Sequence, residues 1–144
     1  MKYSKKNNKI FICLESGDEI MKSLYQLMKL EQVASGWIMG IGACKKIEIG
    51  YYNGKIKDYT KKYFNDDYEI TSLSGNFTTI GEDQKPWWHI HVNFSDKNFN
   101  VFGGHLFTGI ITATCEIIMI TSEEKINRKL DSDIGLCLWD LNNG

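Results

Sequence analysis

The chain has 144 residues, of which 42% are hydrophobic, 12% aromatic and 24% charged, and this composition fits one compact domain better than two. Its 17 basic and 18 acidic residues give a formal net charge of −1, which excludes the strong positive field of a protein built to sit on nucleic-acid backbones. The only arginine is Arg128, so the side chain that most often reads guanine is nearly missing. We therefore expect little base readout by this chain.

Residues 1–8 are predicted to form a short basic N-terminal extension, and residues 9–141 a single domain. The apolar run Ile10–Leu14 is too short for a signal-peptide core or a membrane-spanning segment, so we expect a cytoplasmic protein that does not bind membranes. No Cys-x-x-Cys spacing occurs, which predicts that the four cysteines are reduced, buried packing residues. They are Cys13, Cys44, Cys115 and Cys137.

The next elements along the chain are a predicted strand over Lys9–Glu15 and a predicted helix from about Asp18 to Glu31. Ser16, followed three residues later by Glu19, has the form of a capping box, and apolar residues recur behind it at helical spacing. Because this apolar stripe covers only one face, we expect the helix to pack on a sheet.

Almost all of the remaining chain is predicted to be strand. Asn53-Gly54 is typical of a two-residue hairpin turn between two of these strands. One helix against many antiparallel strands predicts an α+β fold, in which the main helix packs across an antiparallel β-sheet. The expected strands are Trp37–Ile41, Lys46–Tyr52, Lys55–Tyr59, Tyr68–Ile80, Trp87–Ser95, Ile110–Ser122 and Gly135–Leu141.

All three histidines of the chain lie close together in sequence, at His89, His91 and His105. In the expected strand Trp87–Ser95, alternation places His89 and His91 side by side on one face, and the apolar residues between them on the other. A returning segment, Phe99–Leu106, can bring His105 back to this pair. We expect Gly103-Gly104 to help by adopting backbone conformations closed to other residues.

Three neutral imidazoles that converge on one ion and leave a fourth position open are typical of a catalytic zinc site. On spacing alone, a polar cleft of hydrogen-bonded histidines without a metal is an equal alternative. Glu69, Glu82 and Glu116 are possible general bases, although each fits a surface or strand-end carboxylate better. No nucleophile elbow, phosphate-binding loop or Cys-His pair completes an enzyme, so the catalytic residues stay unassigned.

A resemblance to a known family rests on five stretches in order: Phe11–Ile20, Trp37–Ala43, Tyr68–Phe77, His89–Ser95 and Val101–Leu106. These stretches resemble the plant-and-prokaryote-conserved (PPC) domain, in the single-domain type found in bacteria and archaea. The resemblance covers about residues 9–141 and implies an α+β fold that assembles as a homotrimer.

The same resemblance implies a distant similarity to acetolactate decarboxylase, whose zinc is held by a His-x-His pair and a later third histidine. Carried over to this chain, the ligands would be His89, His91 and His105, and the cofactor zinc or another divalent transition metal. The implied function is a stand-alone DNA-binding or regulatory module with a metal site. The alternative is a small zinc-dependent enzyme, decarboxylase- or lyase-like, that acts on a carboxylate metabolite, with a small molecule as its ligand.

The resemblance also assigns binding positions by family motif, at Gly103, Gly104, Glu69 and Ile70. In the plant domains, a Gly-Arg-Phe-Glu-Ile-Leu stretch contacts transcription factors, but the matching stretch Asp66–Thr71 has an acid in place of the arginine. An arginine common in the family's first strand is also replaced near Cys13, and no Arg-Gly-Arg AT-hook exists in the chain. DNA binding is therefore expected only at the non-specific level of about 10⁻⁴ to 10⁻⁶ M.

Overall fold

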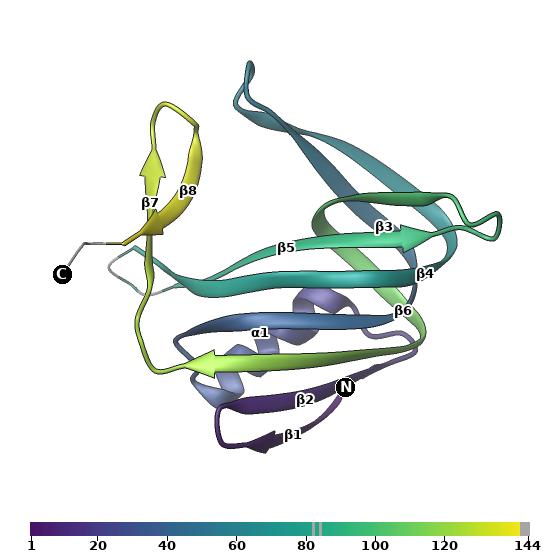
Figure 1. Cartoon of the computed structure of the whole chain (residues 1–144), viewed down its shortest axis with the longest axis horizontal. Coiled ribbons are helices and arrows are strands. Elements are labelled where there is room, and N and C mark those ends of the chain that lie inside the picture. Colours follow the sequence, from purple (N-terminus) through teal and green to yellow (C-terminus); the bar gives the residue numbers. More distant parts are fainter. Residues whose placement is uncertain (82, 84, 142–144) are drawn as a thin grey trace.

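The computed structural model describes residues 1–81, 83 and 85–141, and within them the chain is mostly β-sheet with one short helix (Figure 1). The expected α+β architecture is confirmed. The helix is α1 (Ile20–Glu31), and the described strands are β1 (Lys2–Lys6), β2 (Lys9–Glu15), β3 (Ser35–Asn53), β4 (Asp58–Ile80), β5 (Lys85–Ser95), β6 (Val101–Ser122), β7 (Asn127–Asp131) and β8 (Leu136–Asp140).

The strands form one sheet in the order β1-β2-β6-β3-β4-β7-β8, and β5 pairs with both β4 and β6. Because β3 also pairs with β4 and β6, the four strands β3, β4, β5 and β6 close a ring of hydrogen-bonded neighbours. The pairings are antiparallel except for a short parallel contact between β4 and β7. This ring brings the middle of the chain and its later part together at the site described below.

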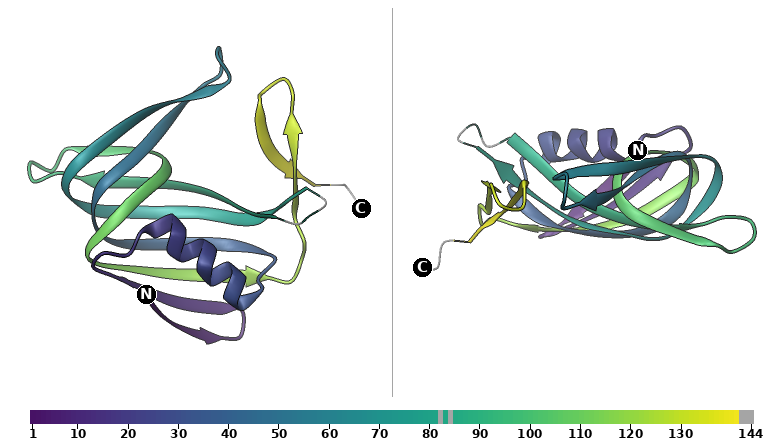
Figure 2. Two further views of the ribbon diagram at one scale, coloured as in Figure 1. Left: turned by 180° about the vertical axis from the view of Figure 1, so that it is seen from behind. Right: turned by 90° about the horizontal axis from the view of Figure 1, so that it is seen from above.

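Helix α1 lies across one face of the sheet, as expected (Figure 2). Its buried residues Leu24, Leu27 and Met28 belong to the same core as alternate residues of β2. The helix begins at Ile20, so the predicted start at Asp18 and the capping role of Ser16 are wrong. Glu19 is itself the N-cap: its carboxylate accepts hydrogen bonds from the backbone N–H groups of Met21 and Lys22, at 3.2 and 2.5 Å.

Several strands are longer than the sequence predicts. The expected strands on either side of residues 42–45 are one continuous strand, β3. The returning segment that carries His105 and the expected strand Ile110–Ser122 also belong to one strand, β6. The two-residue turn at Asn53-Gly54 is also wrong, because Asn53 pairs with Asp58 and the turn spans residues 54–57. The side chain of Asn53 accepts a hydrogen bond from the backbone N–H of Lys55 and stabilises this longer turn.

The ends of the described chain add two strands that the sequence analysis did not expect. The basic stretch at the start contains β1, which pairs along its whole length with β2. Near the other end, β7 pairs with β8, which covers Leu136–Asp140 of the predicted strand Gly135–Leu141. No described helix has the length and apolar character needed to cross a bilayer.

The four cysteines are free thiols that differ in burial. Cys44 and Cys115 are buried, and burial raises the pKa of each thiol to about 12. Cys13 and Cys137 are only half-buried, so the expectation of buried packing residues is wrong for these two, which lie on strands closer to the edges of the sheet.

Two hairpins rise from the same side of the sheet and lean toward one another (Figure 1). One is the distal part of β3 and β4 with its turn, residues 50–61, and the other is the β7–β8 hairpin. Their tips are joined, since the Tyr52 hydroxyl donates to the carbonyl of Ile134 and Lys57 Nζ donates to the carbonyl of Ser132 at 2.8 Å. We call this pair of joined hairpins the arch.

Candidate metal centre

The three histidines come from adjacent strands. His89 and His91 lie on β5 and His105 on β6, and the register of these strands places His91 directly opposite His105. The predicted alternation is confirmed, because the residues of β5 that face the other way are at most 4% exposed. They are Trp88, Ile90, Val92 and Phe94.

The imidazole rings converge. One nitrogen from each histidine can be chosen so that all three atoms lie within 4.8 Å of one another. The closest pair, His89 Nε2 and His91 Nε2, is 3.2 Å apart. Three nitrogens bound to one tetrahedral zinc at about 2.0–2.1 Å would lie roughly 3.4 Å from one another. The cluster therefore needs only a small contraction to hold such an ion.

The site favours neutral imidazoles, the form that binds metals. Burial lowers the pKa of all three histidines; for His105 the pKa falls to about 4, with further lowering by the nearby His89 and His91. In addition, Nδ1 of His105 is buried and has no hydrogen-bond partner within the described part of the chain. A buried nitrogen that lacks a protein partner fits a site whose remaining ligand is an ion.

The glycines before His105 act by close approach. A Cβ on Gly104 would lie 2.8 Å from the carbonyl oxygen of Gly50 on β3, and one on Gly103 would lie 2.1 Å from Oδ1 of Asn93 on β5. Neither glycine has a positive φ angle, so the expected special backbone conformation is wrong. The missing side chains instead let β6 run close to both neighbours, and this places His105 opposite His91.

The carboxylates that the sequence suggested as general bases do not join the cluster. Glu69 is exposed and lies opposite Ser95, four residues along β5 from His91, which is about 13 Å at strand spacing. Glu116 lines a different hollow, on β6. Ile70, a family-motif position, is a core residue with 2% exposure. Glu82 lies outside the described residues.

Other side chains at the site were not found from the sequence. The ring of Tyr59, on β4, packs against His105 with centroids 4.9 Å apart, and Phe107 lies 5.1 Å from the same ring. Lys61 Nζ sits 3.9 Å above the ring of Phe107. The alternation of aromatic residues along β4 and β6 is the one sequence signal for these contacts. It does not specify which side chains meet.

The sequence suggested for Arg128 only a possible contact with DNA bases. In the structure this residue, on β7, is buried, with 8% exposure. Its three guanidinium nitrogens donate to Thr78 Oγ1 at 3.0 Å, to the carbonyl of Cys137 at 2.7 Å and to Asn76 Oδ1 at 2.6 Å. Asn76 in turn lies directly opposite His89 in the pairing of β4 with β5. The arginine is thus linked through one side chain to the histidine cluster.

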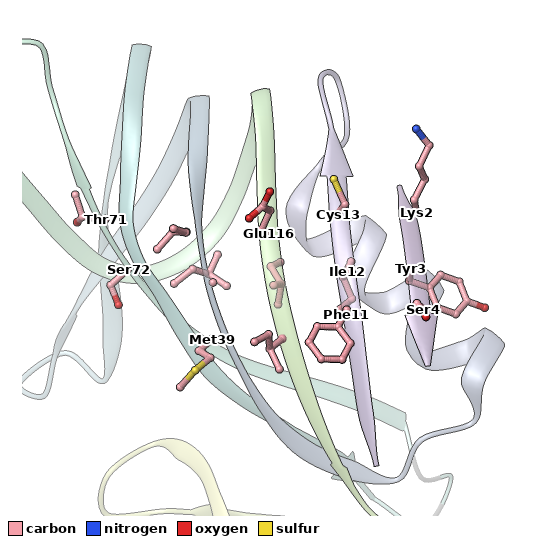
Figure 3. Close-up of a pocket in the computed structure, with 15 residues that line it drawn as sticks. Lys2, Tyr3, Ser4, Phe11, Ile12, Cys13, Met39, Thr71, Ser72 and Glu116 are labelled. Carbon is pink, nitrogen blue, oxygen red and sulfur yellow. The ribbon is translucent and has the colours of Figure 1, made fainter. Parts of the chain in front are cut away.

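A separate hollow of about 820 Å³ lies on the face of the sheet away from α1 (Figure 3). Cross-strand partners such as Phe11, Ile118 and Met39 form rows on this face. We call the exposed apolar residues here the apolar face. Its members, which are 39–59% exposed, are Phe11, Trp37, Met39, Ile41, Ile118 and Ile120.

Fold and site together define a class: a small α+β domain with one helix, a ring of four strands and a three-histidine cluster on the ring. Residues 1–123 match the family model of the Plants and Prokaryotes Conserved (PCC) domain, the same domain that the sequence resembles. The chain therefore belongs to this family. No curated protein matches it.

Solved structures of relatives agree. A candidate DNA-binding protein from Bacteroides thetaiotaomicron is 30% identical, with a TM-score of 0.92 and coverage of 99% of this chain and 98% of that one. A PPC protein from Pyrococcus horikoshii is also 30% identical, with a TM-score of 0.85 and coverage of 99% and 96%. A metal-containing protein from Archaeoglobus fulgidus is 31% identical, with a TM-score of 0.83 and coverage of 96% of both chains.

The similarity to acetolactate decarboxylase is more distant. The enzyme from Bacillus subtilis subspecies spizizenii is 13% identical and has a TM-score of 0.55, with 85% of this chain and 57% of that one covered. At this identity the likeness concerns the fold alone. It confirms the expected structural relation without assigning an activity.

Proposed function

We propose that this chain is a PPC module whose primary ligand is a divalent transition metal, zinc first, bound by His89, His91 and His105. The observation that supports the proposal is the convergence of three ring nitrogens within 4.8 Å in a site where burial favours the neutral form. Imidazole suits zinc and its neighbours among the transition metals. The metal-containing relative from Archaeoglobus fulgidus adds support.

Calorimetric titration of zinc into protein purified without a histidine tag tests this proposal. We expect one zinc per subunit for the unmodified chain and no stoichiometric binding for His91→Ala, because a single strand-paired imidazole is removed. The matched control is Asn93→Ala, two residues along the same face of β5, which should bind zinc as the unmodified chain does. Absence of zinc binding by the unmodified chain would overturn the proposal.

We propose only a secondary role for DNA in this module. The relative from Bacteroides thetaiotaomicron is described as a candidate DNA-binding protein. This chain, however, has a net charge of −1. Its single arginine is 8% exposed, and the guanidinium nitrogens donate hydrogen bonds inside the protein. Arg128 is therefore not available to read base edges. A regulatory role would act through the metal and the assembly rather than through sequence-specific DNA contacts.

We further propose that the module is a homotrimer that buries the apolar face. Contiguous exposed apolar patches of this kind are uncommon on monomers and mark interfaces. The six residues of the face lie on three neighbouring strands, β2, β3 and β6. Four of them, Phe11, Met39, Ile41 and Ile118, line a hollow of about 820 Å³ in which side chains of another copy could pack. The number of subunits, three, is the one that the family resemblance implies.

The second candidate is a small zinc-dependent enzyme acting on a carboxylate metabolite. A three-histidine centre leaves a coordination position open, and when bound there the ion supplies Lewis-acid chemistry. The observation that favours this candidate is the guanidinium of Arg128, which is hydrogen-bonded to Asn76, the cross-strand partner of His89. The described cluster contains no carboxylate, so the proton carrier that we propose is Tyr59, whose ring packs on His105.

A further inference from the structure

Arg128 is a buried cation that is not paired with a carboxylate in the described part of the chain. Its hydrogen-bond partners are a hydroxyl, an amide oxygen and a backbone carbonyl, all of them neutral. No Asp or Glu within the described ranges forms an ion pair with it. Burying a charge is costly unless an opposite charge compensates it, so this arrangement calls for an anion that the described residues do not supply.

The guanidinium also retains hydrogen-bonding capacity. Arginine offers five N–H donors in a planar fork. Three of them are used, by Thr78, Cys137 and Asn76, which leaves two. A fork of this kind suits the two oxygens of a carboxylate. The single positive charge also matches a singly charged carboxylate better than a phosphate, which carries more charge and more acceptors.

The position of Arg128 connects this capacity to the histidines. The guanidinium donates a hydrogen bond to Asn76, which lies directly opposite His89 in the pairing of β4 with β5. The β7–β8 hairpin that carries Arg128 is fixed at its tip to the β3–β4 hairpin, which supplies Tyr59 on the other side of the cluster. The cation is thus connected through Asn76 to the β5 strand that carries His89 and His91.

We propose that Arg128 is the anion-binding residue of the three-histidine site, and that the small molecule bound there carries a carboxylate. This inference rests on the proposed metal-binding function, since it assigns the ligand class of the same site. It concerns residue 128, which lies beyond residues 1–123 matched by the family model.

The test measures binding of acetate, with inorganic phosphate as the competing anion, to the cobalt-loaded protein by visible spectroscopy and to the metal-free protein by calorimetry. We expect acetate to bind more tightly than phosphate to the unmodified chain. Arg128→Gln should weaken acetate binding at least tenfold, and Arg128→Lys should recover part of the loss. Lys129→Gln removes the same charge from the next, exposed residue and should change nothing.

A second variant guards against simple unfolding. Asn76→Asp places a carboxylate against the guanidinium, which is 2.6 Å from the present amide oxygen, and supplies the missing anion from within the chain. We expect this variant to lose acetate binding while its melting temperature stays equal or rises. A merely structural role for Arg128 would leave acetate binding intact in this variant.

Three outcomes overturn the inference: acetate binding unchanged in Arg128→Gln, acetate binding unchanged in folded Asn76→Asp, or phosphate binding tighter than acetate. Failure of the proposed function looks different. If neither zinc nor cobalt binds but the metal-free protein binds acetate through Arg128, the metal site is wrong and the anion site stands. If metal binds and substitution of Arg128 has no effect on acetate binding, the anion site is wrong and the metal site stands.

Discussion

The apolar face and the histidine cluster lie on the same side of the sheet but are built on different principles. The register shows it: the successive cross-strand partners are Phe11, Ile118, Met39, Ser74 and His91, so their side chains point to one side. At the β2 end of this row the side chains are apolar and exposed. At the β5 end the row reaches the exposed His91, which lies beside the half-buried His89 and His105.

The comparison shows that the large hollow and the cluster of metal-binding side chains are two different places on the molecule. The hollow of about 820 Å³ is lined mainly by apolar groups, with Lys2, Cys13 and Glu116 among its lining residues, and so suits the packing of another protein surface (Figure 3). The histidine cluster is compact, and its geometry suits an ion and a small ligand. The two regions should therefore fail independently when mutated.

Met39→Lys is expected to have the largest effect. A lysine at this position, which is 52% exposed in the single chain, would place a charge in the middle of the proposed interface and should weaken assembly more than about a hundredfold. Light scattering should then give a monomer mass, while zinc stoichiometry stays at one per chain. The control Leu30→Lys, on the exposed side of α1, should remain a trimer. A trimer that survives Met39→Lys would place the interface elsewhere.

Gly75→Ala should damage the metal centre and spare the apolar face. A Cβ at Gly75 would lie 2.3 Å from the carbonyl oxygen of His89 and 2.7 Å from Cα of Ile90, so β5 must move away from β4. Overpacking of this kind costs about 1–3 kcal/mol, and we expect a tenfold or larger loss of zinc affinity with the trimer intact. Gly54→Ala is the control, since nothing lies within 4 Å of its added Cβ. Equal zinc affinities for both variants would contradict the close approach of β4 and β5.

Acid should weaken the metal-free protein through the cluster, by a smaller amount. The folded-state pKa of His105 is about 4, below its ordinary value of 6.5, so the unfolded chain binds a proton that the folded chain refuses as pH falls from 6.5 toward 4. At about 1.4 kcal/mol per pKa unit, the loss of stability is about 3 kcal/mol at most. Urea unfolding at pH 7 and pH 4.5 with a chelator present measures it, and His105→Gln should show a smaller difference between the two pH values. The same loss in His105→Gln would assign the effect to other groups.

The cluster could be predicted from the sequence because a strand has a period of two. Once Trp87–Ser95 was assigned as a strand, His89 and His91 had to share a face, and the structure confirms this. The prediction of His105 needed one further step, a return along the neighbouring strand, and the short turn before β6 makes that return local. Local rules were sufficient for these three residues.

Tyr59 and Arg128 could not be predicted in this way. Tyr59 reaches His105 from β4, 46 positions earlier in the numbering, and Arg128 reaches Asn76 through a short parallel contact between β4 and β7. Neither contact follows from periodicity, because each depends on how strongly the sheet curls. The prediction of a two-residue turn at Asn53 was wrong for a more local reason. The side-chain amide of Asn53 can stabilise a longer turn as well as a two-residue one.

The pairing of β2 with β6 has a consequence for how the chain folds. Cys13 Sγ and Thr114 Oγ1 lie 3.4 Å apart although 101 residues separate them in sequence. The β3–β4 hairpin can form from neighbouring residues, whereas β2 must wait until β6 is available. Closing so large a loop is slow, and until it closes the free edge of β2 is open to wrong pairings. We therefore expect the β3–β4 hairpin to gain protection from hydrogen exchange early in refolding, and β2 with α1 to gain it last.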